Sequence, residues 1–183
     1  TSHPLAAKVA VQMMEAGGNA MDGAIAGAVL LGLCEPQMTG IGGDCFVLMT
    51  PPGEDRVVAL NGSGRAPAGI NTAAQRAKGP VIAPQSAAAV TVPGAVDAFC
   101  RLSKDWGKLG IKALLAPSIH YAETGVPVAE RVASDWAGAA ENLSGKARDL
   151  YLLDGKAPRP GQMFRAPAQA KVLRRIAMDG RAG

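Results

Sequence analysis

Apolar residues recur at helical spacing at the start of the chain, and polar or glycine residues mark the predicted helix ends. The opening segment, TSHPLAAKVAVQMMEAGGNA, predicts a helix with Ser2 as its N-cap, Pro4 in its first turn, and Gly17 and Gly18 at its end. The predicted apolar side consists of the larger hydrophobic residues, which are Leu5, Val9, Val11, Met13 and Met14.

A second helix is predicted from about residue 20 to residue 33. Asn19 is its expected N-cap, and Asp22 stands in the first turn, where a carboxylate is favourable. The run AIAGAVLLGL is apolar nearly all round, which indicates a buried helix. Asp22 is therefore interpreted as a helix-start residue rather than a catalytic acid.

The pattern then changes to two short runs rich in β-forming residues, 45–50 and 56–61, separated by the turn sequence PPGED. They predict a β-hairpin. Residues 67–90 indicate a loop with a short helix. The segments PGAVDAFCRLSKDWG and IKALLAPSIHYAETG predict two further helices that end at glycine, and AQAKVLRRIAMDG predicts a closing helix. Helices on both sides of a hairpin favour an α+β or layered αββα arrangement.

Composition supports a folded chain and restricts its partners. The 183 residues are 48% hydrophobic but only 4% aromatic, which predicts one domain over residues 1–183 with a core of small aliphatic side chains. The net charge is +4, but basic residues are scattered except near Lys171, Arg174 and Arg175. Without clustered basic and aromatic residues, nucleic-acid binding is not expected.

The cysteines and the longest apolar run exclude other classes. Cys34, Cys45 and Cys100 are an odd number without metal-type spacing, so they are expected to be buried small hydrophobic residues. The apolar run 24–34 is too short and too interrupted by glycine to span a bilayer. No signal peptide is visible, although the chain opens inside a predicted helix, which is compatible with a leader upstream.

Several candidate chemistries are weak on local grounds. TGIGGDCF is followed by a strand rather than the helix that a phosphate-binding loop requires, so its glycines are expected to serve backbone geometry, at Gly40, Gly42 and Gly43. His3 and His120 lie in predicted helices and are interpreted as structural. Thr1 precedes a helix, whereas an N-terminal threonine nucleophile normally begins a strand.

Arg65 is the most suggestive single residue. It stands in ALNGSGRAPA, where small neighbours leave an open approach to a guanidinium that can bind a carboxylate with two hydrogen bonds. A surface arginine, or a structural ion pair with an acidic residue, is the alternative. Local chemistry leaves both open.

The order of these segments resembles the beginning of the large subunit of γ-glutamyltranspeptidases. The resemblance rests mainly on GGNAMDGAIA and GIGGDCF, with support from HPLA, GRAPA, VPGAVDAF and APSIHYAETGVPV, and it runs from residue 3 to about residue 130. Asp44 and Cys45 stand where that family commonly has glycines.

The resemblance implies an N-terminal nucleophile hydrolase with a four-layer αββα fold, made as a precursor that cleaves itself. The nucleophile would be a threonine at the start of the small subunit, with its own amino group as base, attacking a γ-glutamyl or related acyl amide. No catalytic residue is then expected in this chain, which would be inactive alone. The expected partners are that small subunit and a small-molecule substrate, with no nucleic acid and no membrane span.

The substrate-binding positions depart from the family pattern. Alignment on Ala66-Pro67 places Ser63 where transpeptidases have the arginine that binds the α-carboxylate of the donor, and Arg65 is displaced by two residues, about 7 Å in an extended segment. GSGRAPA looks more like the divergent acylase and amidohydrolase branch. Ser63 and Arg65 are therefore the candidate substrate-binding residues, with Arg65 meeting an acidic group in a differently shaped pocket.

Two further hypotheses about function remain. One is a non-catalytic binding or scaffold domain that retains the fold, and the other is a nucleotide-binding loop. No metal or organic cofactor is suggested, and the sequence does not distinguish an exported protein from a cytoplasmic one.

Overall fold

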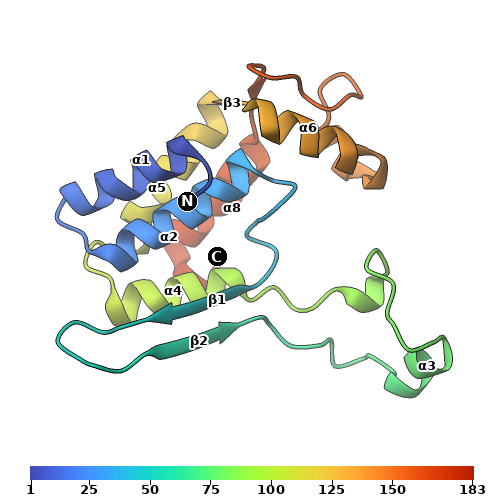
Figure 1. The fold of residues 1–183 in the computed structure, drawn as a ribbon, viewed down its shortest axis with the longest axis horizontal. Helices are drawn as coiled ribbons and strands as arrows, with labels where there is room; N and C mark the ends of the chain where they lie inside the picture. The colour runs from blue at the N-terminus through green and yellow to red at the C-terminus, as the bar shows by residue number, and fades with distance from the viewer. The chain divides into compact units, whose positions relative to one another are not determined.

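The computed structural model describes all 183 residues, which divide into two compact units (Figure 1). The first unit comprises residues 1–40 and 100–183, and the second comprises residues 41–99. Most of the chain's buried hydrophobic side chains belong to the first unit.

The first unit begins with two closely packed helices, α1 (Pro4–Glu15) and α2 (Ala20–Cys34). Gly23 and Gly27 lie one turn apart on α2 and face α1. A Cβ atom at Gly23 would lie 2.9 Å from the carbonyl oxygen of Ala10, and one at Gly27 would lie 3.4 Å from that of Ala6. The missing side chains therefore let the two helix backbones approach each other closely.

Two predicted details of α1 are wrong. Its N-cap is His3, whose Nδ1 accepts a hydrogen bond from the backbone N–H of Leu5 at 3.2 Å, and not Ser2. Val11 and Met14 are 47% and 43% exposed, because the helix turns its small residues, with Val9, toward α2. Close packing against glycines selects a small-residue face, which the apolar pattern alone does not reveal.

Helix α2 is confirmed as buried nearly all round, with ten buried residues among its fifteen. Asn19 and Asp22 form a capping box: the Asn19 side chain accepts from the Asp22 N–H at 3.1 Å, and the Asp22 carboxylate accepts from the Asn19 N–H at 2.9 Å. The helix-start role of Asp22 is confirmed.

Helix α5 (Ile111–Thr124) packs against α2 and against α8 (Pro167–Asp179), and Figure 1 shows these helices side by side. Its inward residues include Leu114, Leu115 and Ala122, and α8 contributes Leu173 and Ile176. The predicted closing helix ends at Gly180, as expected. This aliphatic core matches the low aromatic content of the chain.

The region after residue 125 contains a pair of short strands that the sequence pattern did not predict. A short antiparallel pair joins β3 (Val126–Pro127) to β4 (Met163–Phe164), flanking α6 (Glu130–Ala139) and α7 (Lys146–Tyr151). Three of the chain's seven aromatic Phe, Trp and Tyr residues meet here. The ring of Trp136 lies 4.8 Å from that of Phe164 in an edge-to-face contact, and Tyr151 stacks on Phe164 at 6.2 Å.

The second unit contains the predicted hairpin, β1 (Cys45–Met49) and β2 (Val58–Gly62), paired antiparallel with Leu48 opposite Ala59. The second strand begins two residues later than predicted. One face of the hairpin is exposed, with Phe46 at 65% and Leu48 at 77%. The short helix α3 (Thr72–Ala77) follows β2, and it has no buried residue.

Helix α4 (Ala95–Trp106) begins in the second unit and ends in the first. Both predicted helices in this part of the chain, α4 and α5, are present and are followed by Gly107 and Gly125. The cysteine expectation holds for Cys34, which is buried. It is wrong for Cys45 and Cys100, which are only partly buried. No helix in the structure has the length and apolarity needed to cross a bilayer.

Candidate functional site

The segment that carries Ser63 and Arg65, residues 62–65, lies against residues 91–94 in the second unit. This contact between two glycine-containing backbone segments is here called the crossing. Immediately after β2, the chain runs beside residues 91–94. The N–H of Val92 donates to the Arg65 carbonyl at 2.9 Å, and the Thr91 hydroxyl contacts the Ser63 carbonyl at 3.3 Å. Two backbone segments about thirty residues apart in sequence are thereby fixed to each other.

Gly64 and Gly94 make this crossing possible. Gly64 has φ +73°, and a Cβ atom there would lie 1.8 Å from the carbonyl oxygen of Val92. A Cβ atom at Gly94 would lie 2.2 Å from the carbonyl oxygen of Gly62. Any side chain would collide with backbone, which cannot move aside as a flexible side chain does. Gly64, directly before Arg65, is therefore required by the crossing and also leaves the guanidinium accessible.

The glycine motif before β1 also joins this crossing. The Gly43 carbonyl accepts hydrogen bonds from the N–H groups of Gly94 at 2.9 Å and Ala95 at 3.1 Å, which satisfies two donors at the start of α4. The motif thus serves a helix start through its carbonyl. The expected backbone requirement at Gly40 and Gly42 is not found, because a Cβ atom at either would meet nothing within 4 Å.

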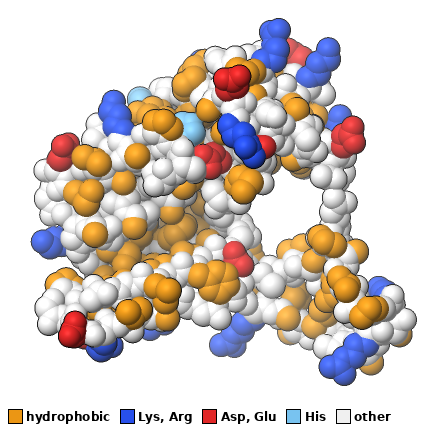
Figure 2. Space-filling view, in the orientation of Figure 1, with side chains coloured by type: hydrophobic (Ala, Val, Ile, Leu, Met, Phe, Trp, Pro, Cys, Tyr) orange, Lys and Arg blue, Asp and Glu red, His pale blue; other side chains and the backbone are white.

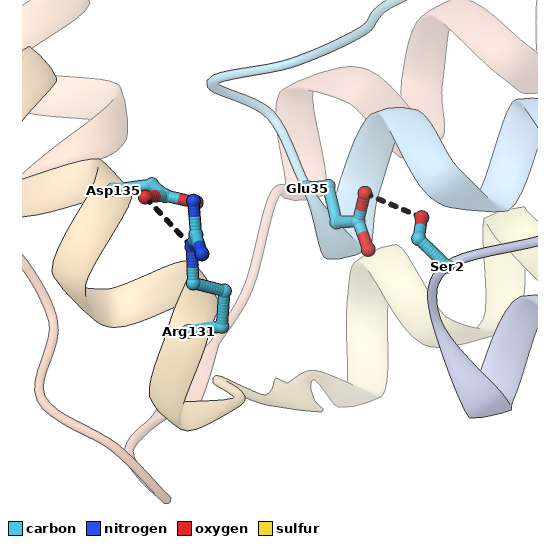
Figure 3. Close-up of polar contacts among 4 residues, drawn as sticks. All are labelled: Ser2, Glu35, Arg131 and Asp135. Atoms are coloured by element: carbon cyan, nitrogen blue, oxygen red, sulfur yellow. Dashed lines mark hydrogen bonds and ion pairs between the residues drawn. The ribbon is translucent and has the colours of Figure 1, made fainter.

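Arg65 is exposed, and its guanidinium makes no hydrogen bond or ion pair. Several other arginines are paired, Arg56 with Glu54, Arg101 with Asp105 and Arg174 with Glu123, whereas Arg76 and Arg175 have no ion-pair partner either. Figure 3 shows the pair of Arg131 with Asp135, joined at 2.9 Å. The structural ion pair that the sequence left open for Arg65 is therefore not formed.

Ser63 lies two residues before Arg65 on the same fixed segment and is half-buried. Its N–H donates to the Asn61 side-chain oxygen at 3.0 Å, which holds the turn. Its hydroxyl contacts only the Gly64 carbonyl, at 3.5 Å, which is too long for a strong hydrogen bond. The hydroxyl and the guanidinium can both donate hydrogen bonds to an anionic or carbonyl group.

The histidines and Thr1, the other candidate residues from the sequence, lie in the first unit and not with Ser63 and Arg65 in the second. His3 is the buried N-cap of α1, whereas His120 is exposed on α5 with its ring against Tyr121. Thr1 is exposed ahead of α1. Ser2, close to it, donates to Glu35 at 2.8 Å, as Figure 3 shows. These residues do not form a nucleophile and base pair.

The thiols of Cys34 and Cys45 are poorly suited to nucleophilic chemistry. Burial, reinforced by the neighbouring Glu35 carboxylate, raises the pKa of Cys34 to about 12. Burial, followed by the charge of Asp44, also raises the pKa of Cys45. Both groups are protonated near neutral pH, and the thiolate is the reactive form. No group of three or more His, Cys, Asp and Glu residues is arranged to hold a metal ion.

Asp22 has a larger role than the sequence indicated. Its carboxylate is fully buried and also accepts hydrogen bonds from the backbone N–H groups of Lys108, at 2.9 Å and 3.1 Å, and Leu109, at 3.3 Å. The Asn19 side chain donates to the Trp106 carbonyl at 2.7 Å. The start of α2 is thus tied to the loop between α4 and α5, about 87 residues away. Only the spacing Asn19–Asp22 signals any of this, and it signals the cap alone.

Comparison with known proteins agrees with this architecture. A family model described as gamma-glutamyltranspeptidase matches residues 6–183. The oxamate amidohydrolase proenzyme of Klebsiella pneumoniae is 39% identical over 186 residues, which cover 97% of this chain and 35% of that protein. The glutathione hydrolase proenzyme of Pseudomonas aeruginosa is 37% identical over 183 residues, covering 95% of this chain and 31% of that protein.

Solved structures give the same result. Cephalosporin acylase from Bacillus halodurans superposes with a TM-score of 0.90 at 40% identity, over 98% of this chain and 35% of that one. Helicobacter pylori gamma-glutamyltranspeptidase gives 0.91 at 27% identity, over 98% and 53%. The predicted fold class is confirmed: the chain is α+β and part of a four-layer αββα N-terminal nucleophile hydrolase fold.

The chain spans about a third of the length of these curated relatives. The match over residues 6–183, the relatives' identities and the shared fold lead to one assignment. This chain belongs to the gamma-glutamyltranspeptidase family of hydrolases.

Proposed function

We propose that this chain is the N-terminal part of the large subunit of an amide hydrolase or acyltransferase, and that it lines the substrate site. The nucleophile would be a threonine at the start of a second polypeptide of the same precursor. The names of the relatives support this proposal, since several are described as proenzymes of glutathione hydrolases, an acylase and an oxamate amidohydrolase.

The observation that carries a binding role is the state of Arg65. An exposed guanidinium without a partner stands on backbone fixed by the crossing at Gly64 and Gly94. An unpaired guanidinium on a fixed backbone is suited to binding a carboxylate through two hydrogen bonds. We assign Arg65 to the acidic group of the substrate and the Ser63 hydroxyl to a neighbouring oxygen.

In the proposed reaction the threonine hydroxyl attacks the amide carbonyl while its own amino group accepts the proton. The amine leaves with a proton, and water or an acceptor amine then releases the acyl group. This chain's contribution is to position the acyl donor, because no residue in it offers a nucleophile and base. It is expected to be inactive by itself.

Kinetics of the full-length enzyme test the role of Arg65. A panel containing oxamate, a γ-glutamyl anilide and simple N-acyl amides would first establish a substrate. Arg65→Ala should then lower kcat/KM by about 30- to 1,000-fold, equivalent to about 2–4 kcal/mol, because a charged substrate group loses its partner. Arg65→Lys should recover only part of this loss, since an ammonium is not bidentate.

Arg56→Ala is the matched control, because Arg56 is also exposed in the second unit but already pairs with Glu54. It should leave kcat/KM within about twofold. If Arg65→Ala retained the parental kcat/KM on every substrate in the panel, Arg65 would have no role in binding. Failure of the full-length protein to hydrolyse any amide would instead count against the proposed activity.

A further inference from the structure

The segment between Arg65 and Val92 is unusual in having no buried residue. Residues 66–91, here called the docking arm, include α3 and a single turn of 3₁₀ helix at Ala87–Ala89. Every residue of the arm is exposed or half-buried. A folded segment of this length normally buries part of its apolar surface to offset the entropy of ordering it.

The two ends of the arm are nevertheless fixed. The crossing joins the two ends of the arm. The Val92 N–H donates to the Arg65 carbonyl, and the backbone of Gly64 lies close to the Val92 carbonyl. The arm also caps its own helix, since the Asn71 side chain accepts from the Ala74 N–H at 2.9 Å. The arm is therefore a structured segment whose two ends are held together.

The exposed apolar side chains of the arm are large. Val81 is 78% exposed, Val90 62% and Ile82 44%. Single exposed hydrophobic residues are ordinary, but three on one unburied segment indicate a surface that is covered in the complete protein.

The charge of the arm identifies the kind of surface that covers it. Residues 66–91 contain two basic residues, Arg76 and Lys78, and no acidic residue. The rest of the chain has 17 basic and 15 acidic residues, so the arm carries half of the formal charge of +4. Figure 2 shows hydrophobic and basic side chains together, without acidic ones, over the region of α3.

We infer that residues 66–91 dock on an acidic, apolar-lined surface of the polypeptide that completes the enzyme. Apolar contacts of Val81 and Ile82 supply the burial that the arm lacks, and Arg76 and Lys78 select the acidic surface. The inference rests on the proposed function, because it requires a second polypeptide. It is consistent with a chain that spans about a third of its relatives' length.

Limited trypsin digestion of the full-length enzyme tests this docking. Arg76 and Lys78 are trypsin sites inside the arm, and a docked arm protects them. The double variant Val81→Asp/Ile82→Asp keeps both sites but places carboxylates against an acidic surface. Cleavage after Arg76 and Lys78, followed by peptide mass spectrometry, should be at least tenfold faster in this variant than in the parent.

Met178→Asp is the matched control, because Met178 is 70% exposed on α8 in the other unit. It should leave cleavage in the arm unchanged. Raising NaCl from 0.05 M to 1 M should accelerate cleavage in the parent at least threefold, because salt screens charge pairs, and should have little effect in the double variant.

Three outcomes would overturn the inference. One is a parent enzyme that is processed and active but is cut in the arm as fast as the double variant, which leaves the proposed function intact. Another is equal acceleration by Met178→Asp. The third is binding of the intact enzyme to phosphatidylserine vesicles that is lost in the double variant, which would make a membrane the occupant. A full-length protein that is neither processed nor active would contradict the proposed function itself.

Discussion

At the scale of single residues, glycine placement controls the candidate site. Gly64 combines a left-handed backbone with a position where added bulk meets the Val92 carbonyl. Gly53 has nearly the same φ, +75°, but a Cβ atom there meets nothing within 4 Å. An alanine at Gly53 would therefore meet only the conformational cost of a positive φ, whereas an alanine at Gly64 would also collide with backbone.

We expect Gly64→Ala to destabilise the full-length protein by about 3–5 kcal/mol, since it adds a backbone collision to the conformational cost. Gly53→Ala should cost about 1–2 kcal/mol, the conformational cost alone. Urea unfolding monitored by circular dichroism measures both. Equal losses for the two variants would mean that the crossing yields to added bulk.

The thiols give a prediction about pH. Because burial and Asp44 raise the pKa of Cys45, its thiolate fraction is below that of an ordinary cysteine near neutral pH and continues to grow as pH rises past the ordinary value. Alkylation of Cys45 by iodoacetamide should thus still be accelerating at pH 9. Cys34, buried with a pKa of about 12, should react only after unfolding.

Peptide mapping after timed alkylation measures both thiols in the same sample. The unfolded protein in urea supplies the reference rate for each. A Cys45 rate that levels off below pH 8.5, or rapid labelling of Cys34 in the folded protein, would contradict the assigned environments.

At the scale of elements, much of the helical pattern was predictable and much of its packing was not. The bounds of α2 and the caps at Asn19 and Asp22 follow from local rules, and the structure confirms them. Local rules failed at α1, where Val11 and Met14 stay nearly half exposed because Gly23 and Gly27 of α2 pack against the backbone of Ala10 and Ala6. The β3–β4 pair was missed because two-residue strands have no periodicity.

The hydrogen bonds from Lys108 and Leu109 to Asp22 illustrate the same limit. They join residues about 87 positions apart, and no sequence spacing marks them. The same holds for the candidate site. The sequence identified Arg65 as a candidate binding residue, but only the structure shows that its guanidinium has no partner and that the crossing fixes its backbone. The roles of Arg65 and Ser63 in binding remain predictions.

Asp22 provides a test at this scale. Asp22→Ala would leave the part-buried backbone donors of Asn19, Lys108 and Leu109 without their acceptor, so it should destabilise the full-length protein by about 3–5 kcal/mol. Asn71→Ala removes a comparable cap from α3, which buries nothing, and should cost about 1 kcal/mol or less. Chemical denaturation checks both, and similar losses would show that the long-range bonds of Asp22 add little.

At the scale of the whole molecule, this chain has the fold of the gamma-glutamyltranspeptidase family and is proposed to share its function with a second polypeptide. The chain supplies a helical unit with an aliphatic core and a second unit that presents Arg65, the docking arm and the exposed face of the hairpin. We propose that this chain alone does not hydrolyse amides. The proposed division of labour therefore assigns substrate positioning to this chain and bond cleavage to another polypeptide of the same precursor.

Mass spectrometry of the purified full-length protein tests that division most directly. We predict that one precursor converts with time into two polypeptides, the second beginning with threonine, and that replacing this threonine by alanine leaves a single inactive chain. A single uncleaved polypeptide that hydrolyses amides, or a cleaved one whose second chain does not begin with a nucleophilic residue, would contradict it.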